Sequence, residues 1–178
     1  MKEDSIMEIT STTRSIVLNW IQPSSFERRF ELHSEKGVFG KLYFETVDTA
    51  SGSLTSTDQT TESWTFKRVG LLNSHITIRA AGTNDNVAIY RSKLFGDGWI
   101  EFTKGSKFHW KSISGIGSKW GFANEQEEIL LAMKSKWYSP LKIQASIEIE
   151  PKGQGLDELP LLLISGWYLM VCSHYAGI

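Results

Sequence analysis

The final part of this chain constrains its fold most, because it is long, apolar and uncharged. From Leu159 to Ile178 the sequence contains no Lys, Arg, Asp or Glu. Asp157 can cap the start of a helix, and Pro160 suits a first helical turn. The apolar side chains cover every side of this helix, which we expect at about 157–175. A helix that is apolar all round is buried either inside protein or inside lipid.

The length of the apolar segment favours one of these two environments. A membrane-spanning helix needs roughly 20 mainly apolar residues, and the strongly apolar part, Leu159 to Cys172, is shorter than that. No basic residue follows it to mark a membrane boundary. Gly166 suits a protein interior, because its missing side chain permits close approach of another backbone. We therefore expect a core helix, with a C-terminal membrane anchor as the alternative.

The chain before this helix has the pattern of short β-strands separated by turns. Apolar and polar residues alternate most clearly in Phe26–His33, Ser63–Val69, Lys107–Lys111 and Leu141–Glu150, as in strands with one buried face. The polar stretch from Asp48 to Glu62 is the best candidate for a loop, which a short strand around Gly52–Ser56 could interrupt. About eleven or twelve strands are expected in all.

The number of strands and the character of the helix together predict one architecture. A barrel of eight strands is filled by its own side chains, whereas a can of about eleven strands has room for a central helix. We predict a mainly β protein, a closed antiparallel barrel of about twelve strands that encloses one apolar C-terminal helix. Residues 1–178 are expected to form a single domain, with strands at about 15–150 and the central helix at about 157–175.

This strand rhythm and the ending from Leu159 to Leu169 resemble the tubby-like superfamily, which includes the tubby C-terminal domain, the LURP-one-related proteins and the phospholipid scramblases. The resemblance covers most of the chain, from about Ile16 onward, and is one of architecture. It implies a C-terminal helix threaded through a barrel and the binding of anionic phospholipid at a basic surface. None of the family's ligand residues can be matched here. The scramblases' acidic calcium-binding segment has no counterpart before Asp157, so calcium dependence is not implied.

Several kinds of chemistry are not indicated by the sequence. The net charge is -1 and the pI about 6.4, so phosphate neutralisation gives no general case for nucleic-acid binding. The four histidines are scattered, Cys172 cannot form an internal disulfide, and no catalytic or cofactor motif occurs. We expect a non-enzymatic protein without cofactor or metal. Met1–Ser5 lacks the basic and apolar regions of a secretion signal, so the cytoplasm is the expected compartment.

One weak basic patch stands out. Strand alternation places Lys107, His109 and Lys111 on one face, opposite Phe108 and Trp110, and Lys104 lies in the adjoining turn. These four polar residues are the candidate site for an anion or lipid headgroup; the alternative is an ordinary solvated strand face.

The expected function is a binding module for anionic lipid headgroups, at a membrane surface, or for a protein partner. A tail-anchored membrane protein and a lipocalin-like carrier are the alternatives. A barrel filled by a helix argues against the carrier, because it leaves no large cavity.

Overall fold

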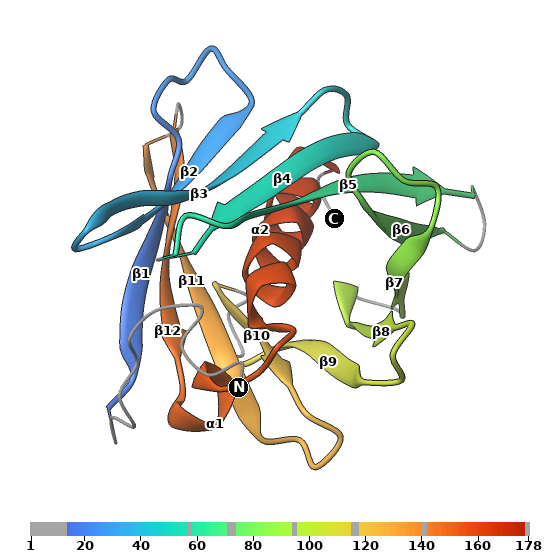
Figure 1. Cartoon of the computed structure of the whole chain (residues 1–178). Helices are drawn as coiled ribbons and strands as arrows, with labels where there is room; N and C mark the ends of the chain where they lie inside the picture. Colours follow the sequence, from blue (N-terminus) through green and yellow to red (C-terminus); the bar gives the residue numbers. More distant parts are fainter. Residues whose placement is uncertain are drawn as a thin grey trace.

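The computed structural model describes residues 14–56, 58–70, 74–93, 96–114, 118–139 and 142–176. Met1–Ser5, whose acids argue against a secretion signal, lies outside these ranges. The described chain forms twelve strands and two helices (Figure 1). They are β1 (Ile16–Ile21), β2 (Arg29–Ser34), β3 (Gly37–Phe44), β4 (Thr49–Thr55), β5 (Thr61–Val69), β6 (His75–Ala80), β7 (Asn86–Ser92), β8 (Gly98–Phe102), β9 (Lys107–Ser112), β10 (Lys119–Ala123), β11 (Ile129–Ser139), β12 (Lys142–Ile149), α1 (Pro151–Gln154) and α2 (Leu159–Ala176).

The strands form one closed antiparallel barrel in which sequence neighbours are also sheet neighbours. β1 closes the barrel against β12, with Ile16 opposite Ile149 and Ile21 opposite Gln144. Every other pairing joins consecutive strands. A closed barrel leaves no free sheet edge. The predicted fold class, a closed antiparallel barrel of about twelve strands enclosing an apolar helix, is confirmed.

Along each strand, side chains alternate between the solvent-exposed outer face of the barrel and its buried inner face. In β5, Trp64 and Phe66 are buried while Thr65 and Lys67 are exposed. The expected loop over 48–62 is mostly strand, because β4 and the start of β5 occupy it. β4 buries Ala50, Gly52 and Leu54 and places its Ser and Thr residues outward. Because two of its three inward residues are small, the sequence of this strand looks polar and predicts a loop.

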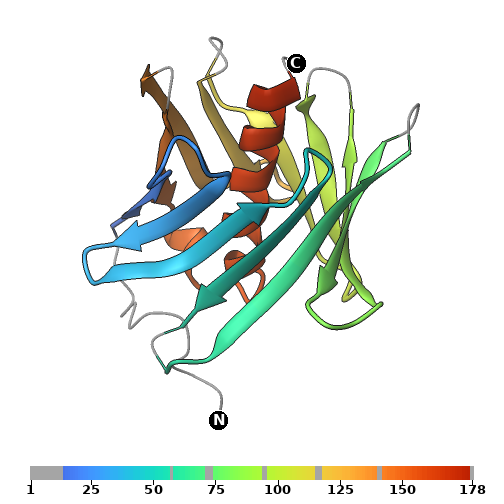
Figure 2. The same ribbon diagram turned by 90° about the horizontal axis from the view of Figure 1, so that it is seen from above.

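Helix α2 runs through the barrel, and its residues from Leu159 to Cys172 are all buried (Figures 1 and 2). Trp167 stacks on Trp20 of β1 with ring centroids 5.8 Å apart and meets Phe30 of β2 edge-on at 5.5 Å. Tyr168 stacks between Phe44 and Phe66 at 5.3 and 4.9 Å. Each aromatic pair contributes about 0.5–1.5 kcal/mol beyond its area burial. The strands therefore form the apolar sheath that the helix requires.

Two glycines set the distance between α2 and the barrel wall. A Cβ on Gly52 of β4 would lie 2.5 Å from Cγ2 of Ile164. A Cβ on Gly166 of α2 would lie 2.7 Å from Cε of Met133, on β11. The helix begins at Leu159, later than the expected 157, and Pro160 lies in its first turn as predicted. No hydrogen bond to the Asp157 carboxylate is present in the described chain, so the expected cap is absent there.

The barrel has two chemically different ends. At the entry end α2 begins, and Ser106 of the β8–β9 turn donates a hydrogen bond to Glu158 Oε1 at 2.5 Å. At the exit end α2 finishes, and the Arg28 guanidinium of the β1–β2 loop lies 5.6 Å from the centre of the Tyr175 ring. Because the strands alternate in direction, the β3–β4, β5–β6, β7–β8, β9–β10 and β11–β12 connections are also at the exit end. In the described chain no helix has the length and apolar character needed to cross a bilayer.

Candidate functional site

The predicted basic residues lie where strand alternation placed them. Lys107, His109 and Lys111 point outward from β9, while Phe108 and Trp110 are buried inside the barrel. Lys104 is exposed in the β8–β9 turn. The structure thus brings the three β9 side chains onto one outer face, which we call the β9 face. It also brings acidic residues to the same place.

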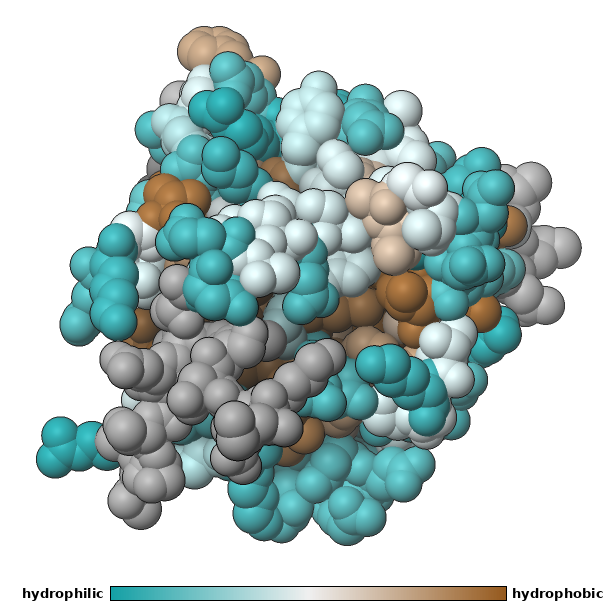
Figure 3. All heavy atoms as spheres, in the orientation of Figure 1, coloured by the Kyte–Doolittle hydropathy of each residue, from teal (hydrophilic) through white to brown (hydrophobic). Residues whose placement is uncertain are grey.

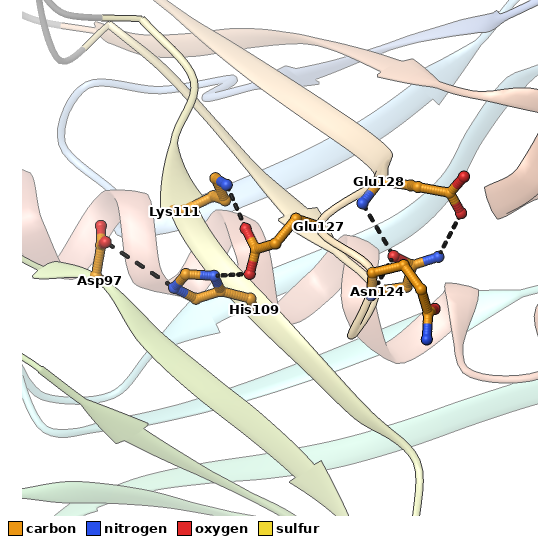
Figure 4. A network of polar contacts seen from close by, with 7 residues as sticks. Asp97, His109, Lys111, Asn124, Glu127 and Glu128 are labelled. Atoms are coloured by element: carbon orange, nitrogen blue, oxygen red, sulfur yellow. Dashed lines mark hydrogen bonds and ion pairs between the residues drawn. The ribbon is translucent and has the colours of Figure 1, made fainter.

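Each basic residue of the β9 face has an acidic partner. Lys107 Nζ lies 2.9 Å from Glu101 Oε1. Glu127 accepts from Lys111 Nζ and lies 3.0 Å from His109 Nδ1 (Figure 4). On the other side of the ring, His109 Nε2 lies 3.9 Å from Asp97 Oδ2. Three carboxylates therefore offset the positive charge of this face.

Glu127 is held in place by an unusual turn between β10 and β11. Its φ is 61°, in the left-handed region that non-glycine residues rarely adopt. The Asn124 side chain fixes this turn, because its Oδ1 accepts from the backbone N–H groups of Gln126 and Glu128 at 3.0 and 2.9 Å. Hydrogen bonds from Lys111 and then from His109 lower the pKa of the Glu127 carboxyl below its usual value. The turn thus keeps a charged carboxylate against β9.

Trp99 of β8 forms the apolar part of the β9 face. Its ring stacks on His109 with centroids 4.5 Å apart. The ammonium groups of Lys107 and Lys93 lie 4.9 and 5.8 Å from the ring centroid, within the range of cation–π attraction. The two cations and the imidazole therefore already occupy positions around the ring. Lys104 forms no ion pair within the part of the chain that the structure describes.

Sequence reasoning missed the acidic half of this cluster. Asp97 reads as part of a glycine turn and Glu127 as part of a solvated acidic turn. Their contact with β9 depends on pairing between β7, β8, β9 and β10, which one strand's pattern does not reveal. The alternation of β9 is enough to predict where its basic residues lie, but not where their acidic partners lie. As a result the β9 face is a compact ion-pair cluster with no excess of positive charge.

The exit end has a different surface, with large apolar side chains at its tips. Phe26 of the β1–β2 loop is 98% exposed and Val47 of the β3–β4 turn 55% exposed. Val69 at the end of β5 and Tyr175 near the end of α2 are 38% and 42% exposed. Five of the seven exposed large apolar residues found in the described chain, these four and Tyr43 near the end of β3, thus lie at one end. Exposed apolar side chains at one rim make it a candidate binding surface.

Basic residues surround these apolar tips. Counted with the two strand residues on each side of every turn, the described exit end carries eight basic and four acidic residues: Arg28, Arg29, Arg68, Arg91, Lys93, Lys111, Lys119 and Lys142 against Glu27, Glu45, Asp48 and Asp97. Counted in the same way, the described turns of the entry end carry four basic and eight acidic residues: Lys36, Arg79, Lys104 and Lys107 against Glu35, Asp58, Glu62, Asp85, Glu101, Glu125, Glu127 and Glu128. The barrel is therefore electrically polarised, with its positive end at the exit. Once alternate turns are assigned to one end, the sequence alone gives this asymmetry.

Burial keeps the Cys172 and Tyr168 side chains of α2 in their neutral forms. Cys172 is 6% exposed, and burial raises the pKa of its thiol to about 11, so the thiolate is scarce at neutral pH. Burial also raises the pKa of the Tyr168 hydroxyl. Among the described residues, no group of His, Cys, Asp or Glu is arranged to hold a metal ion.

Comparison with protein-family models, curated proteins and solved structures gave no match to this chain. The assignment of a function therefore depends on the geometry of the surfaces described above.

Proposed function

We propose that this protein is a non-enzymatic binding module that docks on an anionic membrane surface through the exit end of its barrel. The observation that carries the proposal is Phe26, which is 98% exposed beside Arg28 and Arg29. An apolar side chain flanked by cations suits the boundary between lipid headgroups and acyl chains. The proposal puts the chain in the cytoplasm, at the inner face of a membrane. The tubby-like resemblance, with its phospholipid binding, remains part of this proposal.

The expected affinity follows from the charges and tips. An excess of four basic residues contributes about 4 kcal/mol at an anionic surface, at about 1 kcal/mol each. Full burial of a Phe or Val side chain contributes about 1.5–3 kcal/mol. With Phe26 and Val47 each at the lower bound, the total is about 7 kcal/mol, which corresponds to a Kd of about ten micromolar. Binding of this strength is reversible, as expected for peripheral attachment.

Vesicle binding by two matched double variants tests the proposal. The first, Phe26→Asp with Val47→Asp, alters the exit end. The control, Val17→Asp with Val38→Asp, changes two residues 61% and 45% exposed that lie near the entry ends of β1 and β3. Both variants add the same charge and remove exposed apolar side chains. Co-sedimentation with vesicles of phosphatidylcholine and phosphatidylserine is the assay.

The exit-end variant should bind at least about tenfold more weakly, whereas the control should bind like the wild type. Wild-type binding should also weaken as salt is raised, because the charges are exposed. Equal loss in both double variants, or loss in neither, contradicts the proposal. The double variant Lys107→Glu with Lys111→Glu forms a third arm of the experiment. If this is the only variant that loses vesicle binding, the binding site lies on the β9 face.

A protein partner with an acidic surface is the second candidate. The same end would serve, because protruding aromatic residues surrounded by cations also suit a protein interface. Retention of the chain by a partner in the absence of vesicles, lost in the Phe26→Asp and Val47→Asp variant, would favour this candidate.

A further inference from the structure

The charges at the two ends of the barrel are only partly offset by local ion pairs. At the exit end, five basic residues form no ion pair in the described chain, against two such acidic residues: Arg28, Arg68, Arg91, Lys93 and Lys142 against Glu45 and Asp48. At the entry end, five exposed acidic residues form no ion pair with another described residue, against three such basic residues: Glu35, Glu62, Asp85, Glu125 and Asp157 against Arg14, Lys36 and Lys104. The unpaired charge is therefore positive at the exit end and negative at the entry end.

The dipole of α2 does not cancel this polarity. A helix dipole is equivalent to about half a positive charge at the N-terminus and about half a negative charge at the C-terminus. Because α2 begins at the entry end and finishes at the exit end, its dipole opposes the side-chain charges. The excess of unpaired side-chain charge is three at the exit end and two at the entry end, which is larger than half a charge in both cases. Each end therefore keeps the sign of its side chains.

Both ends also carry exposed apolar side chains. Phe26 is almost fully exposed at the exit end, and Val17 and Val38 are exposed near the entry ends of β1 and β3. In Figure 3 an apolar side chain protrudes at the tip of the β1–β2 loop, at the top of the view, whereas the β10–β11 turn at the bottom is hydrophilic. Contact between the two ends would remove apolar surface from water, which is favourable.

The position of the two ends determines which contacts between copies are attractive. Alternate turns of the barrel lie at opposite ends of its axis. Two copies related by a shift along this axis place the exit end of one against the entry end of the other, which brings opposite charges together. Contact between two exit ends, or between two entry ends, brings like charges together. A contact between two different surfaces of one protein leaves a free surface on each outer copy, so it can continue from copy to copy.

We propose that this chain self-associates head to tail, with the exit end of one copy docked on the entry end of the next. Complementary charge orients the two copies, and the apolar residues at the two rims add buried surface. The interface is weak and sensitive to salt, because its charges are on the surface. This inference does not rest on membrane docking. Both use the exit end, so a second copy and an anionic membrane compete for it.

Sedimentation velocity of the full chain without vesicles tests the proposal. Between about 0.01 M and about 1 M salt, the screening length falls from about 30 Å to about 3 Å. At low salt the wild type should form species larger than a dimer as its concentration approaches about 1 mM. These species should dissociate at high salt. A wild type that stays monomeric at low salt overturns the proposal.

Two charge-reversal variants locate the contact. The exit variant, Arg28→Glu with Arg91→Glu, leaves the exit end with an excess of one negative unpaired charge. The entry variant, Glu35→Lys with Glu125→Lys, leaves the entry end with an excess of two positive ones. Each variant alone should be monomeric at low salt, because like charges then face each other. An equimolar mixture should associate again, since opposite charges meet at every head-to-tail contact between the two variants.

Three controls make these results decisive. Melting curves of both variants should match that of the wild type, because the four residues are exposed and form no ion pair in the described chain. An entry variant that still associates indicates contact between two exit ends and overturns the proposal, as does a mixture that stays monomeric. The membrane proposal is judged separately, because the entry variant should keep its binding to anionic vesicles while self-association is measured without them.

Discussion

Replacement of Trp167 by Ala is the sharpest test of α2 as the core of the barrel. Trp167 is fully buried and contacts Trp20 and Phe30 from two strands. Truncation of a buried Trp to Ala destabilises a protein by about 3–5 kcal/mol. The Nε1 atom of Trp167 has no partner in the described chain, so its removal returns about 1 kcal/mol. We expect a net loss of about 3 kcal/mol, against a total stability of roughly 5–15 kcal/mol for a typical domain.

The assay is urea unfolding followed by far-UV circular dichroism, because Trp fluorescence would change with the substitution itself. Trp167→Phe keeps a six-membered aromatic ring but loses the pyrrole part of the indole together with its unpaired N–H, so a smaller loss of about 1–2 kcal/mol is expected. Tyr175→Ala alters the same helix at a residue 42% exposed and should cost about 1 kcal/mol at most. A loss below about 1 kcal/mol for Trp167→Ala, equal to that of Tyr175→Ala, would refute the role of α2 as the core.

Three further outcomes are expected. A chain ending at Gly155 lacks α2 and should lose its cooperative thermal transition in circular dichroism; a cooperative melt would make the helix an appendage. Because the Glu127 pKa is lowered in the folded state, its stabilising effect is full above the unfolded pKa of about 4.3 and is lost as pH falls through the lower folded value. Between about pH 5 and pH 3 the melting temperature of the wild type should therefore fall more than that of Glu127→Gln. Parallel curves of melting temperature against pH for the two proteins would contradict this. The Cys172 thiol should react with a disulfide reagent slowly in the native state at about pH 8 and rapidly in urea, whereas fast native reaction would mean that the helix end opens.

The architecture could be predicted from the sequence because one element fixes it. A segment from Leu159 to Cys172 that is apolar on every side requires a complete apolar sheath, and only a large closed barrel supplies one from short strands. The strand positions follow from alternation where large apolar residues point inward, as in β5. They do not follow for β4, where Gly52 must be small because Ile164 lies against it.

The candidate site could be predicted only in part. The common face of Lys107, His109 and Lys111 is a property of one strand, so period-two alternation is enough to find it. Their neutralisation by Glu101 and Glu127 depends on contacts between strands and on a turn at positive φ. A single sequence contains no local signal for either. The turns that carry the exposed apolar residues could have been placed at one end of the barrel from the sequence, once an up-and-down order of the strands was assumed.

The order of the strands also bears on how fast the barrel folds. Eleven of its twelve pairings join consecutive strands and can form as local hairpins. The seam between β1 and β12 instead joins residues as distant as Ile16 and Ile149. Closing a loop of that length has an entropic barrier of about 4 kcal/mol. Because α2 lies inside the closed ring, we expect helix entry and closure of this seam to be coupled late in folding, and substitutions at Leu18 or Ile147, which pair across the seam, to speed unfolding.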